Sequence, residues 1–285
     1  MRLSRTNVHA VPRACVEAIE AMANGRRHDG RVVLVTGGAK GIGAAISQRF
    51  LASGATVVAC GRSAPESVSL PDVDGRHIDF RVCDIRDPDA VAALMDGIVT
   101  DHDRLDVLVN NAGGSPPAAA ADASPRFLAA IIDLNLTAPF VCAQHANRVM
   151  QQQDAGGVIV NVASVSGTRP SPGTAAYGAA KAGLLNLTTT LAVEWAPKVR
   201  VVAVTPGLIM TDTAEDHYGD GEVRAAVEST VPLGRFGTPE DVAAACVWLA
   251  SDEAAYATGT HLVLDGGGSR PAFLQAYERA TGVRR

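Results

Sequence analysis

Aromatic residues and charge are both scarce in this chain. Aromatic residues make up 4% of its 285 residues, and charged residues make up 19%, against 47% hydrophobic residues. A composition so low in charge can bury a sizeable core, which argues against intrinsic disorder. The formal net charge of −5 argues against a surface that binds nucleic acid or an anionic membrane.

The sequence also lacks metal-ligand spacings and long apolar runs. No CxxC pair occurs among its five cysteines, Cys15, Cys60, Cys83, Cys142 and Cys246, and its seven histidines show no HxxxH or Cys/His spacing. We therefore expect no metal site, and buried free thiols in a reducing compartment. No uninterrupted apolar run approaches the ~18 residues of a membrane span. Residues 1–30 lack the apolar core of a signal peptide, so we expect a cytoplasmic protein.

Short apolar runs alternate with segments of helical period. After "RVVLVTGG", which starts at Arg31, similar runs occur at 55–60, 77–84, 105–113, 157–164, 199–207 and 260–268. Helical periodicity marks 41–53, 87–101, 134–152, 175–196 and 238–250. Near-continuous apolar strands between helices are typical of a parallel sheet covered on both faces. We predict an α/β fold over 31–268: one doubly wound, Rossmann-like domain with a seven-stranded parallel sheet and helices on both faces.

Three segments lie outside this pattern. Residues 1–30 form an N-terminal extension, in which Met22 is an alternative start. Residues 115–125, "SPPAAAADASP", predict a loop after the fourth strand. Residues 269–285 form a C-terminal tail with Phe273, Leu274, Tyr277 and Ala280 at helical spacing. The tail helix either packs on its own domain or reaches a neighbouring subunit near its active site.

The stretch "TGGAKGIG" (36–43) connects the first strand to a helix. Gly37 permits a tight turn, Gly41 lets the backbone approach a diphosphate, and Gly43 lets helix and strand pack closely. The helix N-terminus then offers free N–H groups to the diphosphate. The spacing Gly-x₃-Gly-x-Gly differs from the standard fingerprint, and the Gly-Lys-Ser/Thr ending of a P-loop is absent. We predict a dinucleotide site at this loop, which also holds Lys40 and Ile42.

The second strand ends in "VVACGRS", where the ribose of the adenosine is expected to bind. Gly61 stands where an acidic residue would select NAD, and Arg62 and Ser63 follow it. The planar guanidinium of Arg62 suits a 2′-phosphate, and Lys40 adds a second positive charge. We therefore favour NADP(H). NAD(H) stays possible, with both cations as ordinary solvated surface residues.

The stretch "TAAYGAAKAG" (174–183) sets Tyr177 four residues before Lys181. This spacing puts both side chains on one face of a helix. The ordinary pKa of tyrosine, near ~10, is too high for ready proton exchange at neutral pH. We expect the neighbouring ammonium to lower the pKa of Tyr177, which would make it a general acid and base. The small Ala and Gly neighbours leave room for a cofactor.

Taken together, these stretches resemble the classical short-chain dehydrogenase/reductase family over about 31–268. Further segments that match are "NNAG" (110–113), "LNLTAPF" (134–140), "VASVSG" (162–167), "PGLIMT" (206–211), "PLGRFGTPEDVA" (232–243) and "VLDGGG" (263–268). The resemblance implies an NAD(P)(H)-dependent oxidoreductase that interconverts a carbonyl and a secondary alcohol. It also implies a homotetramer that pairs the helices at 134–152 and 175–196.

The resemblance implies roles for individual residues. Ser164 would hydrogen-bond the substrate carbonyl, with Ser166 as a less well spaced competitor. Asn135 would hold a water in a proton relay beyond Lys181, which would also bond the nicotinamide ribose. Further cofactor contacts implied are Asp84 and Ile85 at the adenine, Asn110, Ala112 and Gly113 at the adenine ribose, and Pro206, Gly207, Ile209 and Thr211 at the nicotinamide.

The segment 212–230 is where this family builds a substrate lid. It is acidic and short of large apolar residues, and His217 and Tyr218 are the candidates for shaping a pocket. We expect a small-molecule substrate and a 3-oxoacyl-type ketoreductase; a secondary-alcohol, sugar-alcohol or steroid dehydrogenase is the alternative. A nucleotide-sugar epimerase or dehydratase usually carries a longer substrate domain. A non-catalytic nucleotide sensor is disfavoured because Tyr177 and Lys181 are both present.

Overall fold

The computed structural model describes residues 27–64, 73, 75–212, 218–268 and 271–283. Its centre is a seven-stranded sheet in the order β3-β2-β1-β4-β5-β6-β7, and every neighbouring pair of strands is parallel. The strands are β1 (Val32–Thr36), β2 (Thr56–Gly61), β3 (Asp79–Val82), β4 (Val107–Asn110), β5 (Gly157–Val162), β6 (Val199–Pro206) and β7 (His261–Leu264). The predicted seven-stranded parallel sheet is confirmed.

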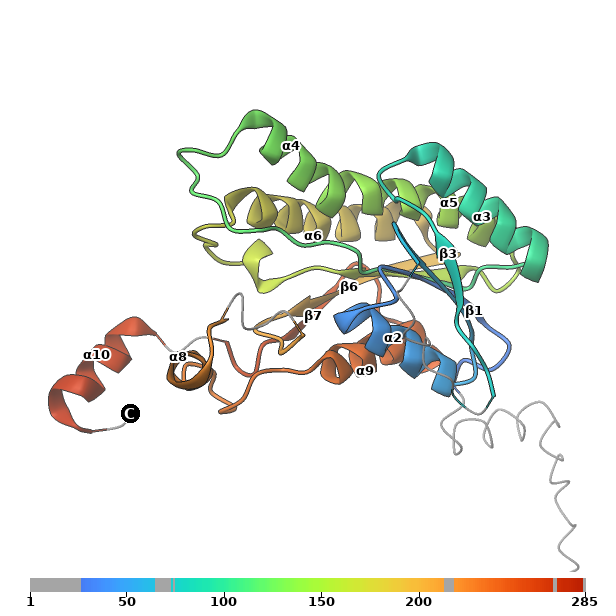
Figure 1. Ribbon diagram of the computed structural model, residues 1–285. Helices are drawn as coiled ribbons and strands as arrows, with labels where there is room; N and C mark the ends of the chain where they lie inside the picture. Colours follow the sequence, from blue (N-terminus) through green and yellow to red (C-terminus); the bar gives the residue numbers. More distant parts are fainter. Residues whose placement is uncertain (1–26, 65–72, 74, 213–217, 269–270, 284–285) are drawn as a thin grey trace, which may run out of the picture.

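Helices cover both faces of this sheet (Figure 1). Helices α2 (Gly41–Ala52) and α9 (Pro239–Ala250) lie on one face, and α3 (Pro88–His102), α5 (Ala138–Gln152) and α6 (Ala175–Trp195) lie on the other. Alternate residues of β1 belong to opposite cores: Val33 and Val35 to the first, Val32 and Leu34 to the second. Burial on both faces explains why the strands read as continuous apolar runs.

Several helices begin at a polar residue followed by proline. Asp87 accepts from the backbone N–H groups of residues 89 and 90 at the start of α3, and Ser124 accepts from that of Phe127 at the start of α4 (Pro125–Ile132). Thr238 and Asp241 form a reciprocal capping box at α9. Because Ser124 caps α4, the helical stretch that runs on through α5 begins at Pro125. This is nine residues before the start of the helical periodicity at 134–152. Within the described residues, the remaining helices are the π-helix η1 (Asp133–Thr137), η2 (Val165–Gly167), α8 (Gly221–Glu228), η3 (Asp252–Ala254) and α10 (Ala272–Thr281).

Elements α4, η1 and α5 form one helical stretch, Pro125–Gln152. By length and composition alone it could cross a membrane, with a mean hydropathy of 1.5 over 18 residues, 33% of them buried. Our search for uninterrupted apolar runs missed it because polar residues interrupt the stretch. Core helices of soluble proteins pass the same test. Here the stretch lies against α3, α6 and strands β4 and β5, as a helix that covers the sheet.

The packed structure begins before Arg31, the residue that we predicted as the start of the domain. His28 is fully buried. Its backbone N–H donates to the Ser53 carbonyl at 3.0 Å, and its Nε2 is hydrogen-bonded to the Val247 carbonyl at 3.0 Å. Its ring also meets the edge of Phe50, with centroids 4.9 Å apart. The turn at residues 27–30 is therefore part of the core. Residues 1–26, with the alternative start at Met22, lie outside the described residues.

The tail helix α10 lies beyond α8, away from the sheet (Figure 1). Phe273 is 71% exposed and Val283 is 53% exposed, so these apolar side chains are not covered by their own domain. Packing of the whole apolar face on its own domain is therefore not observed. Contact with a neighbouring subunit stays a prediction.

Four cysteines within the described residues are free and buried, namely Cys60, Cys83, Cys142 and Cys246. Burial raises the pKa of Cys142 and of Cys246 to about 12, so both remain uncharged thiols at neutral pH. These four agree with the predicted buried thiols, and Cys15 lies outside the described residues.

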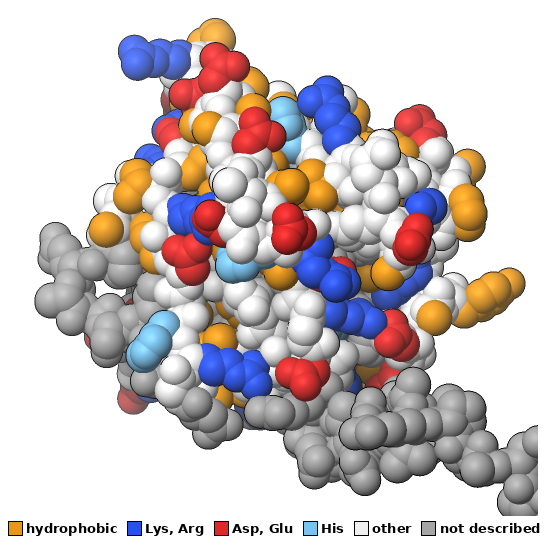
Figure 2. All heavy atoms as spheres, turned by 90° about the vertical axis from the view of Figure 1, so that its right-hand side faces the viewer, with side chains coloured by type: hydrophobic (Ala, Val, Ile, Leu, Met, Phe, Trp, Pro, Cys, Tyr) orange, Lys and Arg blue, Asp and Glu red, His pale blue; other side chains and the backbone are white. Residues whose placement is uncertain are grey.

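Charges of both signs are interspersed on the face that Figure 2 shows. Around β3 and α3, Arg81 bridges Asp79 and Asp101 at 2.7 Å each, and Arg86 pairs with Asp84 at 2.6 Å. Such pairs leave little uncompensated charge on this side of the protein.

Candidate active site

The candidate site lies at the carboxyl ends of the central strands. The strand order changes direction between β1 and β4, because β1 has β2 on one side and β4 on the other. Ligands of open α/β sheets bind at such a switch point. The segments that leave β1, β4 and β5 here are the glycine loop, "NNAG" and the Ser164 segment.

The glycine loop fits a diphosphate closely. Gly37 and Gly41 have left-handed φ angles of 64° and 50°, and a Cβ at Gly43 would collide with the Gly37 carbonyl oxygen. Helix α2 begins at Gly41, and no acidic residue occupies its first turn. Lys40 stands at the N-cap, and the neighbouring Ile42 is half-buried against the core. Exposed N–H groups, the helix dipole and a nearby cation all favour an anion.

Three residues that support this loop were not identified from the sequence. A Cβ at Gly38 would lie 2.7 Å from Ser47 Oγ, so the glycine is required for packing. Asn111 Nδ2 donates to the carbonyls of Thr36 and Gly37 at 2.9 and 3.3 Å. Thr36 Oγ1 accepts from the backbone N–H groups of Asn111 and Ala112, both at 3.0 Å. The second asparagine of "NNAG" was the available signal.

Asn110, whose contact with the adenine ribose stays a prediction, has its side chain buried beneath the site. Its side chain is 2% exposed, and Nδ2 donates to the Pro139 carbonyl and to Asn161 Oδ1, both at 3.0 Å. It joins β4 to β5 and α5 beneath the site. In the same motif, Ala112 lies directly against Gly37, since a Cβ at Gly37 would be 3.1 Å from its Cα.

The adenine end is exposed and charged. Arg62 and Ser63 lie in an exposed bend after β2. Asp84 accepts from Arg86 at 2.6 Å, and this bond, with smaller help from the charge of Arg62, lowers the pKa of Asp84. Ile85 is only 5% exposed and packs in the core. Its side chain therefore does not present the adenine-flanking surface we expected.

Ser164, Tyr177 and Lys181 come together between β5 and α6. The hydroxyl of Ser164 lies close enough to Tyr177 to act on the pKa of the phenol. Lys181 is 3% exposed, and its Nζ donates to the Val162 carbonyl at 2.8 Å and lies 5.6 Å from the centroid of the Tyr177 ring. Ser164 Oγ also accepts from the backbone N–H of Ser166 at 3.2 Å. Of the two serines, Ser164 is therefore the one beside the tyrosine.

Burial governs the protonation of this group. It lowers the pKa of Lys181 to about 8. Burial also raises the pKa of Tyr177, with the Ser164 hydroxyl acting in the opposite direction. Our expectation that Lys181 lowers the pKa of Tyr177 does not hold for the chain itself, because the cost of burying a phenolate is the larger effect. The positive ring of an oxidised nicotinamide would act to lower it.

Asn135 links the loop after β4 to the end of α4. It is fully buried in the π-helical turn η1, and such turns are frequent at functional sites. Its Nδ2 donates to the carbonyls of Ile131 and Gly114, and its Oδ1 accepts from the Gly114 N–H, all at 2.9 Å. A Cβ at Gly113 would lie 2.7 Å from Asn135 Oδ1 and 3.3 Å from Lys181 Nζ. Glycine is therefore needed where these two side chains meet.

The segment after β6 closes the opposite side of the site. Pro206 ends β6, and the Gly207 N–H donates to the Leu264 carbonyl at 2.8 Å. Ile209 is 6% exposed, so its side chain belongs to the core. Thr211 lies near the glycine loop, since a Cβ at Gly41 would be 3.9 Å from its Cγ2. Gly41 and Thr211 thus lie next to each other.

The start of the expected lid carries an aromatic pair. Tyr218 stacks on Phe236, with centroids 5.1 Å apart and planes at 24°. Tyr218 also contributes to the raised pKa of Tyr177. Residues 213–217, which include His217, lie outside the described residues.

Comparison with known proteins agrees with this geometry. Residues 37–269 match the family model described as enoyl-(acyl carrier protein) reductase. The chain is 41% identical over 243 residues to 3beta-hydroxysteroid dehydrogenase 1 of Eggerthella lenta, covering 84% of this chain and 93% of the relative. It is 39% identical over 245 residues to a 3-oxoacyl-(acyl-carrier-protein) reductase of Thermotoga maritima, covering 85% and 98%. D-threitol dehydrogenase of Mycolicibacterium smegmatis is 37% identical over 246 residues, covering 85% and 94%.

Solved structures show the same architecture. The aldohexose dehydrogenase of Thermoplasma acidophilum superposes with a TM-score of 0.77 at 33% identity, covering 86% of this chain and 95% of that one. A short chain dehydrogenase from Bacillus anthracis gives 0.75 at 34% identity, covering 84% and 96%. With a family model matched over most of the length and relatives above 30% identity, this chain belongs to the short-chain dehydrogenase/reductase family and is an oxidoreductase of hydroxyl and carbonyl groups.

Proposed function

We propose that this protein is an NADP(H)-dependent ketoreductase that uses Tyr177 as its general acid and base. The observation that carries the proposal is the cluster of Ser164, Tyr177 and Lys181 at the carboxyl end of β5. The cluster adjoins the glycine loop through Gly113, where an added Cβ would lie 3.3 Å from Lys181 Nζ. A nicotinamide cofactor whose diphosphate is held by the glycine loop would supply or accept the hydride.

In the proposed reaction, the hydroxyl of Tyr177 protonates the carbonyl oxygen of the substrate. Ser164, which lies close to Tyr177, provides the second hydrogen bond to that oxygen. Lys181 stays charged in its buried place at neutral pH, since its pKa of about 8 is still above 7. Its ammonium stabilises the tyrosinate that remains after proton transfer, and Asn135 holds the loop and the proton relay beside it.

The preference for NADP(H) is a proposal from Arg62 and Lys40. Both side chains are exposed, Arg62 after β2 and Lys40 before α2. A guanidinium and an ammonium would both be available to a 2′-phosphate. NAD(H) is the alternative, to be decided by binding.

The substrate class is also a proposal. The 3-oxoacyl-(acyl-carrier-protein) reductase among the relatives supports a 3-oxoacyl-type carbonyl. Relatives named 3beta-hydroxysteroid dehydrogenase and D-threitol dehydrogenase support a steroid or sugar alcohol as the second candidate. We further propose a cytoplasmic homotetramer, which light scattering tests: a monomer at micromolar concentration would contradict it.

The first experiment is a fluorescence titration with NADPH and NADH, followed by turnover of a short 3-oxoacyl thioester, a sterol and a sugar alcohol. We expect tighter binding of NADPH and reduction of the 3-oxoacyl thioester. Tighter binding of NADH with oxidation of an alcohol would favour the second candidate. Binding without turnover of any carbonyl or alcohol would contradict the proposed reaction.

A further inference from the structure

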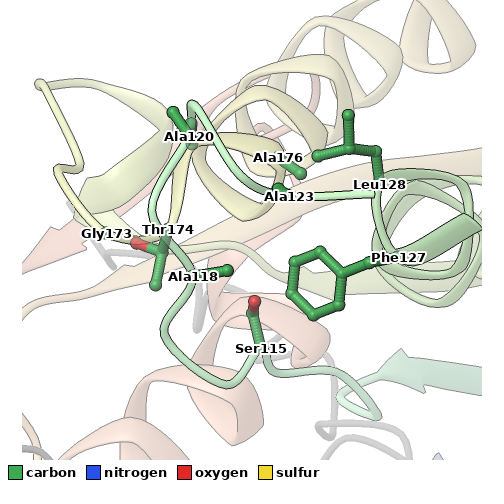
Figure 3. A pocket seen from close by; sticks show the side chains of 10 residues that line it. Ser115, Ala118, Ala120, Ala123, Phe127, Leu128, Gly173, Thr174 and Ala176 are labelled. Atoms are coloured by element: carbon green, nitrogen blue, oxygen red, sulfur yellow. The ribbon is translucent and has the colours of Figure 1, made fainter. Parts of the chain in front are cut away.

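A small pocket lies next to the proposed catalytic centre, between the loop after β4, the start of α4 and the start of α6 (Figure 3). Its volume is about 190 Å³. The side chains that shape it include Ala118, Ala123, Phe127, Leu128 and Ala176. We call it the arm pocket.

The arm pocket adjoins the catalytic residues along both chain segments that form it. On one side, Ser115 lines the pocket and directly follows Gly114, whose backbone is held by Asn135. On the other side, Ala176 lines the pocket and directly precedes Tyr177. Both chain segments that form the arm pocket therefore continue directly into the proposed catalytic centre.

The two walls of the arm pocket are tied together. The backbone N–H of Ala118 donates to the carbonyl of Gly173 at 2.8 Å, which joins the loop after β4 to the segment before α6. Ser124 caps α4 and thereby fixes the first turn that carries Phe127. Hydrogen bonds within the fold therefore hold the walls of the arm pocket in place.

The surfaces that the arm pocket offers are apolar. Figure 3 shows the Phe127 ring facing Ala118 and Ser115 across the pocket. The polar groups at its edge have partners already: Ser115 Oγ donates to the Pro116 carbonyl at 2.9 Å, and Thr174 Oγ1 lies 2.6 Å from Ser171 Oγ. No charged side chain is among the described residues that line it. Such a surface binds hydrocarbon and disfavours hydroxylated or charged groups.

The size of the arm pocket limits the group it can hold. An apolar protein cavity of about 150 Å³ accommodates benzene. At 190 Å³ the arm pocket suits a ring or chain of roughly six to eight carbon atoms on the same scale. A four-ring steroid nucleus is much larger, and a sugar alcohol carries hydroxyl groups that the lining cannot pair.

We propose that the arm pocket binds a compact apolar arm of the substrate, of about six to eight carbon atoms, while the carbonyl is reduced at Tyr177. This inference rests on the proposed function and deepens it, because it makes the substrate a medium-sized ketone or 3-oxoacyl compound. Ala118, Ala123 and Phe127 are then the residues that determine specificity for the arm.

The test compares alkan-2-ones from butan-2-one to dodecan-2-one with the wild-type enzyme and NADPH, or NADH if it binds more tightly. We expect kcat/KM to rise up to about fourfold per methylene group while the arm fills the pocket. The rise should stop near an arm of eight carbons. An unchanged kcat/KM across the series, or a rise that continues to the longest ketone, would overturn the proposal.

Two variants change the pocket in opposite directions. Ala123→Leu should lower kcat/KM for octan-2-one at least about tenfold and leave butan-2-one within about twofold. Phe127→Ala should move the optimum to longer ketones. The control is Ala121→Leu, on the same loop but exposed and outside the lining, which should keep the wild-type profile. Equal profiles for all four proteins would overturn the proposal.

A binding measurement separates this inference from the proposed function. Saturation-transfer NMR with octan-2-one detects the arm without turnover. If no ketone is reduced but octan-2-one binds wild type and not Ala123→Leu, the arm pocket stands and the proposed reaction fails. If ketones are reduced but octan-2-one binds both proteins equally, the arm pocket is wrong and the proposed reaction stands. Loss of both signals overturns both.

Discussion

The ammonium nitrogen of Lys181 lies 5.6 Å from the centroid of the Tyr177 ring while it donates a hydrogen bond to the carbonyl of Val162 at 2.8 Å. The last residue of β5 thus holds the lysine, and the lysine ammonium faces the tyrosine ring. Because Val162 is two residues before Ser164, one strand end positions both partners of Tyr177. The hydroxyl, the phenol and the ammonium are therefore set by a single junction between strand and helix.

Tyr177→Phe should lower kcat at least about 100-fold, because it removes the group that exchanges the proton. The affinity for NADPH should change less than about threefold, since the ring and its packing remain. Steady-state kinetics and fluorescence titration measure the two quantities. Tyr256→Phe is the control, because Tyr256 is fully exposed and has no proposed role in the site. Normal turnover by Tyr177→Phe would remove the catalytic assignment.

Arg62→Ala should weaken NADPH about 10- to 100-fold, the usual worth of a hydrogen bond to a charged group. NADH, which has no 2′-phosphate, should lose less than about threefold. Titration of both cofactors against the variant checks this. Arg49→Ala, at an exposed position on α2, serves as the matched charge control. Equal losses for both cofactors would show that Arg62 does not contact the phosphate.

Lys181→Met should raise the free energy of unfolding of the protein alone at pH 7. Burial lowers the pKa of Lys181 from 10.5 to about 8, so below pH 8 the fold carries a costly buried ammonium. That cost is up to about 3 kcal/mol, less about 1 kcal/mol for the lost bond to Val162. It declines as pH rises from 8 towards 10.5, so the advantage of the variant should shrink over this range.

Urea unfolding at pH 7 and pH 9.5 measures this difference. Lys198→Met is the control, because Lys198 also donates to a backbone carbonyl, that of Gln153 at 2.7 Å, but is only half-buried. A Lys181→Met protein that is less stable than wild type at pH 7, by as much as the control, would contradict the account.

His28 should make the protein sensitive to mild acid. Burial lowers its pKa from 6.5 to about 4, so between these values the unfolded chain takes up a proton that the folded chain does not. Stability that is present above pH 6.5 is lost as pH falls towards 4. At pH 4.5 the loss is about 2 to 3 kcal/mol.

Chemical unfolding of wild type and His28→Leu from pH 7.5 to pH 4.5 tests this expectation. The variant should lose about 2 to 3 kcal/mol less than wild type over that range. His77→Asn, which replaces an exposed histidine, should follow the wild-type curve. Parallel curves for wild type and His28→Leu would show that the buried ring does not set the acid sensitivity.

Local signals in the sequence were enough for the sheet and most of the helices. A strand buried on both faces must be apolar at every position, as Val32 to Val35 are, and the Gly-rich turn into α2 has to follow the first such strand. Tyr177 and Lys181 needed only helical spacing to be assigned to one face. These features depend on neighbours in the chain, so they can be read without the fold.

The residues whose side-chain surroundings were not predicted are those with neighbours from distant segments. Ile85 and Ile209 match family positions at the cofactor, yet both side chains pack into the core. Asn110 joins two strands and a helix, and Asn111, its neighbour, holds the glycine loop. No local pattern distinguishes such positions, because the partners lie up to about 75 residues away.

By itself, then, the sequence determined the parallel sheet, its two helical layers and the tyrosine–lysine pair, because apolar periodicity and helical spacing are properties of adjacent residues. Only the tertiary structure decided the protonation of that pair, the burial of His28 and the existence of the arm pocket. Each of these depends on how much water distant segments exclude: packing of β5 against α6 desolvates Lys181, and packing of α4 and α6 around the loop after β4 leaves the pocket.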